Sequence, residues 1–194
     1  MAKNAKPASE KLNYLSLCLN TNGRLEKFLS KKPVLGADSF VASNATILGD
    51  VRVGEHSSIW YGSVLRADIN YIEIGRCSNI QDGVIGHLSD DQPLIVGDYV
   101  TVGHGAIIHA CTIEDECLIG MNSTILDGAV IGTQSTIAAG AVVPAGMIVP
   151  PGALIAGVPG KLKRILKEEE REGLKKWAEK YIDVAKAHQK AGSV

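Results

Sequence analysis

Aliphatic side chains recur along this chain at intervals of six residues. The first series contains Leu35, Val41, Ile47, Val53, Ile59 and Leu65, and it resumes after a three-residue insertion at Ile74 and Ile80. Its later members are Val96, Val102 and Ile108, then, after a one-residue slip, Ile113, Ile119, Ile125, Ile131, Ile137, Val143, Val149 and Ile155. An α-helix repeats every 3.6 residues and a half-buried strand every two, so neither produces this period. Chance periodicity in a chain rich in Val, Ile and Gly is the alternative, and the unbroken run from 113 to 155 argues against it.

A period of six predicts a coil of three short parallel strands joined by tight corners. Each side of the coil uses six residues, and one aliphatic side chain per side points inward to stack on the coil below. Glycine follows many of these positions, as at Gly36, Gly54 and Gly75, and we expect it to supply the positive φ that corners need. Residues 34–160 therefore predict a mainly β domain of about seven coils, stacked at the ~4.8 Å spacing of a parallel sheet.

Different segments flank the repeat on its two sides. Residues 161–190 are highly charged, and an apolar stripe at spacings of three and four predicts a C-terminal amphipathic α-helix: Leu174, Trp177, Ala178, Tyr181, Ile182 and Ala185. We expect this stripe to cover a side of the coil or a neighbouring subunit rather than a membrane surface, because acidic residues interrupt the basic face at 168–170. Residues 1–33 predict an N-terminal arm, in which residues 14–20 are either a strand or part of the arm.

Composition and charge narrow the classes of function. The 194 residues carry 20 basic and 21 acidic side chains, so a formal net charge of −1 predicts neither a nucleic acid nor an anionic membrane as partner. The apolar runs are shorter than the ~20 residues needed to cross a bilayer. We expect a cytoplasmic protein, because the four cysteines show no CxxC pair and no secretory signal is evident. A mitochondrial presequence is the less favoured alternative, since the N-terminal arm holds a single arginine, Arg24, and acidic residues.

Three of the five histidines cluster within the repeat, at His87, His104 and His109. His87 and His109 are 22 residues apart, and removal of a short loop at 88–93 leaves close to one coil of eighteen. The two imidazoles should therefore stack on adjacent coils, whereas His104 should lie on another strand or near a corner. A single rod does not easily bring three such rings to one point, but two neighbouring rods can. We therefore expect a cyclic homotrimer with one site at each interface.

Three neutral imidazoles and an open position are the ligands of a catalytic zinc site, because a structural site fills all four positions. The alternative is three ordinary surface histidines. A polar set flanks them, with Arg66 and Asp68 alternating in one strand and Gln81 and Asp82 shortly before the first histidine. Arg66 could pair with Asp82 one coil away, and these charges could equally be an interface ion pair with no part in the chemistry. Gln81 could orient a metal-bound water or a ligand.

Four segments, in this order, resemble the gamma-class carbonic anhydrase family of hexapeptide-repeat proteins: SSIWYGSVLRADIN (57–70), SNIQDGVIGH (78–87), TVGHGAIIH (101–109) and LIGMNSTILDGAVI (118–131). The resemblance covers about residues 34–160. It implies a left-handed parallel β-helix, a homotrimer, and an interfacial Zn2+ or Fe2+ held by the three histidines named above. It also implies that Arg66 and Asp82 form an intersubunit ion pair and that Gln81 and Asp68 line the site.

The reaction implied by this resemblance is the reversible hydration of carbon dioxide, in which a metal-bound hydroxide attacks carbon dioxide and bicarbonate leaves. The chain departs from the family's prototype, whose long acidic loop carries a glutamate as proton shuttle. The short loop here offers only Asp90 and Asp91, Ile69 replaces a further glutamate, and Ile155 stands where many short-loop relatives have a tyrosine.

Two other functions remain open. One is a metal-bound scaffold trimer of the same fold without hydratase activity. The other is a coenzyme A-dependent hexapeptide acyltransferase, which the ending AGVPGK (156–161) favours. The three-histidine cluster argues against the acyltransferase, because such enzymes usually need one catalytic histidine beside a coenzyme cleft.

Overall fold

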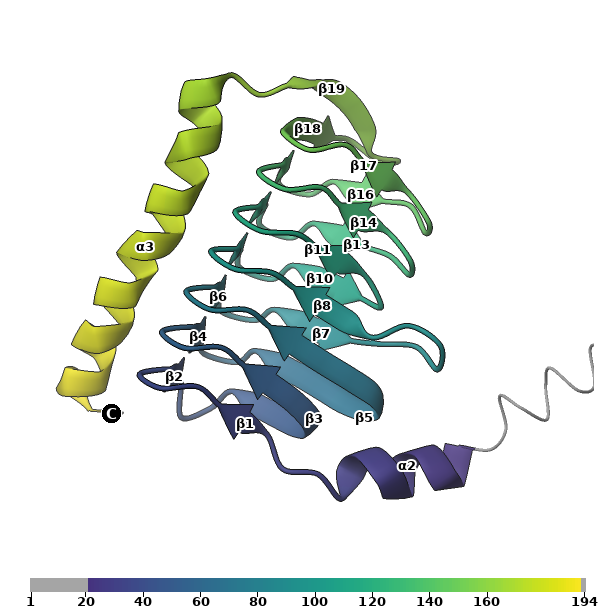
Figure 1. The fold of residues 1–194 in the computed structure, drawn as a ribbon, viewed down its shortest axis with the longest axis vertical. Coiled ribbons are helices and arrows are strands. Elements are labelled where there is room, and N and C mark those ends of the chain that lie inside the picture. The colour runs from purple at the N-terminus through teal and green to yellow at the C-terminus, as the bar shows by residue number, and fades with distance from the viewer. Residues whose placement is uncertain (1–20, 193–194) are drawn as a thin grey trace, which may run out of the picture.

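The computed structural model describes residues 21–192 and shows a solenoid of stacked coils with a long helix along one side (Figure 1). The chain makes about seven turns, and strands of successive turns pair in parallel, as the period of six predicts. The fold is therefore mainly β, with short strands at the inward-facing positions of the repeat.

The three sides of the coil form two sheets. The long strands β3 (Thr46–Val53) and β5 (Val64–Ile74) run around one corner and join two sides into a single 11-stranded sheet. We call the side that holds their first halves face A; it continues through β7 (Ile85–His87), β10 (Ile107–His109), β13 (Thr124–Ile125) and β16 (Val142–Val143). Face B holds their second halves with β1 (Val34–Leu35), β8 (Leu94–Val96), β11 (Thr112–Ile113), β14 (Val130–Ile131) and β17 (Ile148–Val149).

Face C is the separate 8-stranded sheet. It consists of β2 (Phe40–Val41), β4 (Ser58–Ile59), β6 (Asn79–Ile80), β9 (Thr101–Val102), β12 (Leu118–Ile119), β15 (Thr136–Ile137), β18 (Ala153–Ala156) and β19 (Lys161–Ile165). All its pairings are parallel except the last, in which β19 runs antiparallel to β18.

The aliphatic series fills the interior of the solenoid. On face C, one ladder of paired residues has no exposed surface: Ile59, Ile80, Val102, Ile119, Ile137 and Ile155. Burial of each such side chain contributes roughly 1.5–3 kcal/mol to folding, so the ladder is a main source of stability. The first member of the series differs, since Leu35 is 49% exposed. It lies on the first coil, where no further coil covers it.

The glycines that follow the aliphatic positions serve a different purpose from the one expected. Gly54 and its equivalents have ordinary φ values, and positive φ falls elsewhere in the corners, for example at Gly62 and at His56. A Cβ at Gly54 would lie 2.6 Å from the backbone nitrogen of Arg76 on the next coil. Glycine is required there because the backbones of stacked corners approach too closely for any side chain.

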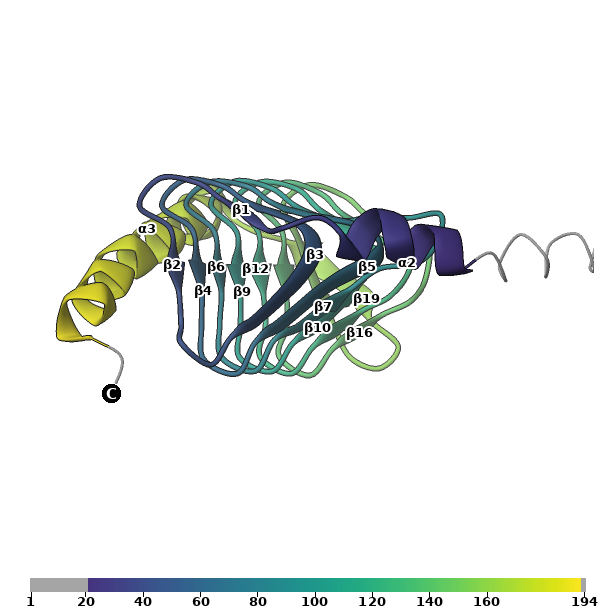
Figure 2. The ribbon, with the colours of Figure 1, turned by 90° about the horizontal axis from the view of Figure 1, so that it is seen from below.

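A helix packs beside the N-terminal end of the solenoid. Within the expected N-terminal arm, Thr21–Leu29 forms α2, which packs against β5 and β3 (Figure 2). Residues 1–20, including the segment 14–20 and Cys18, lie outside the described residues. The three described cysteines are buried and form no disulfide with one another: Cys77, Cys111 and Cys117.

The C-terminal helix α3 (Glu168–Ala191) starts later than expected, because Lys161–Ile165 adds strand β19 to the last coil instead. Glu170 fixes the start of the helix by accepting a hydrogen bond from the backbone of Lys167 and pairing with Arg164. The helix returns along face C, where the Tyr181 ring packs edge-on to the Trp60 ring at 5.6 Å. The expected apolar stripe thus covers the solenoid. No helix among residues 21–192 is long and apolar enough to span a membrane.

Candidate metal centre

His87 and His109 stand one above the other at the ends of β7 and β10, paired in register on adjacent coils. Nδ1 of His87 lies 3.1 Å from Nε2 of His109, and the ring centroids are 5.1 Å apart. Two nitrogens bound to one tetrahedral zinc ion, each about 2.0–2.1 Å from it, are about 3.3–3.4 Å apart. The spacing of these two nitrogens therefore fits two ligands of a single ion.

His104 lies at a different corner of the coil. It falls between β9 and β10, where face C meets face A, whereas His109 ends β10 where face A meets face B. Five residues separate the two, which corresponds to roughly 16 Å of extended chain. Among residues 21–192, no three His, Cys, Asp or Glu side chains of one chain are close enough to hold a metal ion. One chain thus brings together two of the three expected ligands.

Each of the three histidines contacts one carboxylate. The separations are 3.0 Å from His87 Nε2 to Asp68, 2.8 Å from His104 Nδ1 to Asp82, and 2.6 Å from His109 Nδ1 to Asp127. A carboxylate on the far nitrogen of a ligand histidine fixes the ring's orientation and tautomer. Asp127 was not anticipated from the sequence. Its signal was its position, 18 residues after His109, which is one coil of the repeat.

The carboxylates determine which ring nitrogens carry protons. A carboxylate accepts hydrogen bonds, so Nε2 of His87 donates to Asp68 and Nδ1 of His109 donates to Asp127. In neutral rings the other two nitrogens are then unprotonated, and these are the two that face each other at 3.1 Å. Two lone pairs so placed repel each other unless a proton or a metal cation lies between them. The donor set therefore fits a metal ion.

The burial of His87 favours its neutral form. Burial lowers the pKa of His87 below its ordinary 6.5, although the hydrogen bond to Asp68 opposes the shift. Burial alone would raise the pKa of Asp68, but the hydrogen bonds from His87 and Arg66 outweigh it, and the pKa is lowered. An ionised Asp68 beside a neutral His87 is the arrangement that metal ligation requires.

Arg66 and Asp82 do not pair within one chain. Arg66 bonds to Asp68 in its own strand, while Asp82 contacts His104 and accepts a hydrogen bond from the backbone of Tyr61. The reason is their placement at opposite ends of face A. Leu65 pairs with Gly86, so the next residue, Arg66, is level with His87 at the His87 end of the face. Asp82 lies at the opposite end, beside His104.

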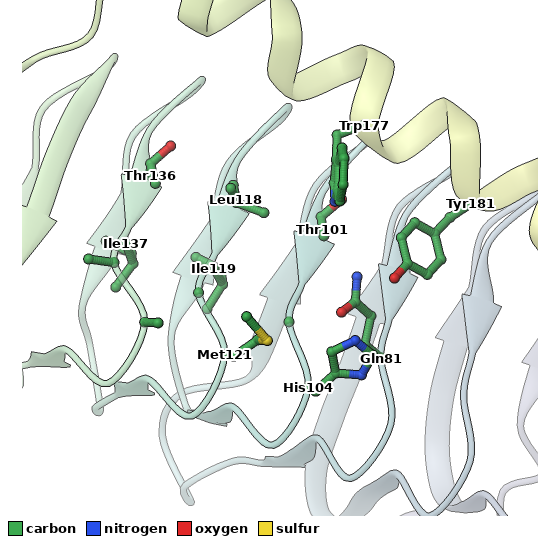
Figure 3. Close-up of a pocket in the computed structure, with 14 residues that line it drawn as sticks. Gln81, Thr101, His104, Leu118, Ile119, Met121, Thr136, Ile137, Trp177 and Tyr181 are labelled. Carbon is green, nitrogen blue, oxygen red and sulfur yellow. The ribbon is translucent and has the colours of Figure 1, made fainter.

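Gln81 lies beside His104 and away from the other two histidines. Its amide donates to Asn79 at 3.0 Å, and the side chain is almost fully buried. Gln81 and His104 line a groove of about 350 Å³ between face C and α3, whose walls are mostly apolar (Figure 3). Met121, Trp177 and Tyr181 form part of those walls. In one chain, therefore, Gln81 shares the corner of His104 only.

The loop at 88–93, which follows His87, is tied down from two directions. Arg24 of α2 donates to the backbone carbonyl of Asp90, and its guanidinium lies 3.7 Å from the Asp91 carboxylate. Asn70, two residues after Asp68 in β5, donates to the carbonyl of Ser89 at 3.1 Å. The side chain of Asp91 is 78% exposed, so it is open to solvent.

Comparisons with known proteins agree with the hexapeptide repeat. The family described as bacterial transferase hexapeptide (six repeats) matches residues 32–67 and 110–145. A protein named "Probable carbonic anhydrase" from Methanocaldococcus jannaschii is 55% identical over 75% of this chain and 91% of its own length. Gamma carbonic anhydrase 2, mitochondrial, from Arabidopsis thaliana is 40% identical over 88% of this chain, which spans 63% of that relative.

Among solved structures, a hexapeptide transferase family protein from Anaplasma phagocytophilum has the same fold. It superposes with a TM-score of 0.78 at 42% sequence identity, and the match covers 80% of this chain and 92% of that one.

Proposed function

The chain belongs to the gamma-type carbonic anhydrase family of hexapeptide-repeat proteins, a family of lyases, and from that membership we propose that it catalyses the reversible hydration of carbon dioxide to bicarbonate. One observation carries the proposal: Nδ1 of His87 and Nε2 of His109 face each other at 3.1 Å, with a carboxylate on the far side of each ring. That arrangement provides the larger part of a catalytic metal site in a single chain.

The metal site is proposed to form between chains. His87 and His109 of one chain and His104 of a neighbour would hold Zn2+, with Fe2+ as the second possibility. When bound, such an ion lowers the pKa of a water molecule and so supplies a nucleophile at neutral pH. Three protein ligands leave room for that water, which distinguishes a catalytic site from a structural one.

The side chains around the histidines have separate tasks in this proposal. Asp68 and Asp127 hold the two imidazoles in the orientation that ligation needs. Gln81 can donate or accept a hydrogen bond, so beside His104 it is suited to orient the substrate. The apolar walls of the adjoining groove suit carbon dioxide, which carries no charge, better than bicarbonate. Asp91 is exposed in the loop that follows His87 in the sequence and is the candidate to pass the proton to solvent.

A homotrimer is the assembly we propose. Face A exposes three large apolar side chains, Leu48, Ile85 and Ile107, each between 41% and 43% exposed. Exposed apolar patches of this kind mark interfaces between proteins. One rotation that brings the His104 corner of a chain to the His87 corner of the next would also bring Asp82 to Arg66. The three histidines and the Arg66–Asp82 pair are each divided between the same two corners of face A. Both sets therefore support the same contact between chains.

The cytoplasm is the compartment we propose. The described cysteines are buried thiols that form no disulfide with one another, which is the usual state in a reducing compartment. A mitochondrial location is the alternative, since the Arabidopsis relative is named as a mitochondrial protein.

Two other functions compete with hydration. The hexapeptide transferase likeness and the groove beside His104 favour a coenzyme A-dependent acyltransferase as the second candidate. A metal-bound scaffold trimer would keep the metal centre without turnover. The acyltransferase does not account for the paired histidine nitrogens and their carboxylates, whereas the scaffold would share them and would differ only in lacking turnover.

Stopped-flow hydration of carbon dioxide by zinc-loaded protein tests the proposal. We expect activity in the parent protein and in His56→Asn, in which asparagine tolerates the positive φ at this position, and loss of activity in His104→Ala. Loaded protein no faster than His104→Ala would reject hydration. Full metal occupancy without activity would favour the scaffold. Thiol release from acetyl-coenzyme A with an amine or hydroxyl acceptor, undiminished by metal removal, would favour the acyltransferase.

A further inference from the structure

We propose that Asp127 is a positioning residue of the metal centre, one that holds His109 in the tautomer and orientation in which Nε2 can bind a metal. This inference rests on the metal site of the proposed function. It concerns a residue that acts through His109 and does not itself touch the metal or the substrate.

The contact is short and is built into the repeat. Nδ1 of His109 lies 2.6 Å from Oδ1 of Asp127, within the range of a strong hydrogen bond to a charged acceptor. Asp127 occupies the corner between β13 and β14, one coil above the corner that follows His109. The stacking of coils, and not a flexible surface contact, therefore places the carboxylate against the ring.

The backbone of this corner is fixed on both sides. The carbonyl of Asp127 accepts a hydrogen bond from Gly146 on the coil above, and the amide of Gly128 donates to Ala110 on the coil below. Gly128 has a φ of +68°, a conformation in which glycine is favoured. A carboxylate attached to this fixed backbone has few positions to occupy. A residue that orients a metal-binding histidine needs this restriction.

No competing cation explains the presence of Asp127. Among residues 21–192, no lysine or arginine forms an ion pair with it, and its side chain forms a hydrogen bond with His109 only. Its side chain is 45% exposed, so the pair contributes little to folding. Asp127 thus has a small effect on stability and directly contacts His109, which is a proposed metal ligand. We therefore expect it to act on His109.

The tautomer is the property that Asp127 controls. Free imidazole favours the proton on Nε2, and in His109 that proton would occupy the nitrogen that faces His87. The carboxylate reverses this preference by accepting a hydrogen bond from the protonated Nδ1. Without the carboxylate, the His109 ring is free to rotate and must change tautomer before it can bind a metal.

The experiment compares Asp127→Ala and Asp127→Asn with a matched control, Asp38→Asn, which alters another aspartate that approaches a histidine, His56, at 3.8 Å and far from the centre. Zinc affinity is measured by competition with a chelator. We expect affinity to fall about 10- to 100-fold in Asp127→Ala, less in Asp127→Asn, which keeps an acceptor, and not in the control. The midpoint of thermal unfolding of metal-free protein should shift by less than about 4 °C.

Nitrogen-15 NMR of the metal-free protein supplies a readout that does not depend on activity. The spectrum of His109 should show a protonated Nδ1 in the parent and a shift toward protonated Nε2 in Asp127→Ala. Unchanged zinc affinity and an unchanged tautomer would overturn the inference even if the parent hydrates carbon dioxide. A parent that binds zinc but lacks hydratase activity would reject the proposed function and leave the inference standing. A parent that binds no zinc would overturn both.

Discussion

His87 and His109 stand in register on adjacent coils, with Nδ1 of the first 3.1 Å from Nε2 of the second. Asp68 and Asp127 accept hydrogen bonds from the opposite ring nitrogens, so in neutral rings the two lone pairs point at each other. A cation between the two nitrogens would replace their mutual repulsion with two coordinate bonds.

Zinc should stabilise the protein through this pair. At a free zinc concentration of 100 times the dissociation constant, binding adds about 2.7 kcal/mol to the free energy of unfolding, a rise of roughly 5–11 °C in the unfolding midpoint. His109→Ala should lose most of this rise because it removes one of the facing nitrogens. Differential scanning calorimetry with zinc and with a chelator measures the effect. An equal rise in the unfolding midpoint of the parent and of His109→Ala would show that zinc binds elsewhere.

Mixed trimers should restore sites that neither variant forms alone. His87→Ala lacks a ligand at one corner of face A, and His104→Ala lacks the ligand at the other. If each site joins corners of two chains, refolding an equal mixture gives about one intact interface in four, because each interface draws its two chains independently. Zinc content and hydration rate of the mixture measure the recovery. A mixture that stays as inactive as its components would show that the site does not lie between chains.

Ile107→Glu should break the assembly and, with it, metal binding. Ile107 is 43% exposed on face A, so a charge there costs the single chain little but would be desolvated in an interface. We expect sedimentation velocity to show a trimer for the parent and a smaller species for the variant, with zinc lost in parallel. The control is Ile148→Glu on face B, where the side chain is 68% exposed. Trimers in both variants would argue against face A as the interface.

Cys111 and Cys117 should be inert in the folded protein. Burial raises the pKa of each thiol from 9.0 to about 12, so the reactive thiolate is absent at pH 8. A raised folded-state pKa contributes stability that is complete below pH 9 and is lost as the pH rises from about 9 toward 12. A thiol reagent should therefore label both residues only when denaturant is present. The midpoint temperature of thermal unfolding should decrease as the pH is raised from 9 to 11. Rapid labelling at pH 8 without denaturant would contradict this.

Ile119→Ala should destabilise the fold far more than the truncation of an exposed isoleucine. Its side chain is fully buried between Val102 and Ile137, and the cavity left by truncation costs about 2–5 kcal/mol. Ile148→Ala removes the same atoms from an exposed position and should cost less than about 1 kcal/mol. Denaturant unfolding of metal-free protein gives both values. Similar losses for the two variants would mean that the ladder does not carry the fold's stability.

The sequence alone determined the coil and the stacking of the first and third histidines. A side of six residues puts one residue in six inward, so the period identifies the core without knowledge of any contact. The same arithmetic places His109 over His87, because the loop at 88–93 interrupts the coil without changing its path.

Tertiary structure decided what depends on contacts between coils. Glycine follows the inward positions because neighbouring backbones approach to within 2.6 Å of a Cβ, a distance that no period encodes. Lys161–Ile165 became a strand because the open edge of β18 offered it partners. The pairing of Asp127 with His109, and of Arg66 with Asp68 instead of Asp82, followed from which corner each side chain occupies. Sequence spacing gives the height of a residue along the solenoid, but only the folded chain fixes the corner at which it lies.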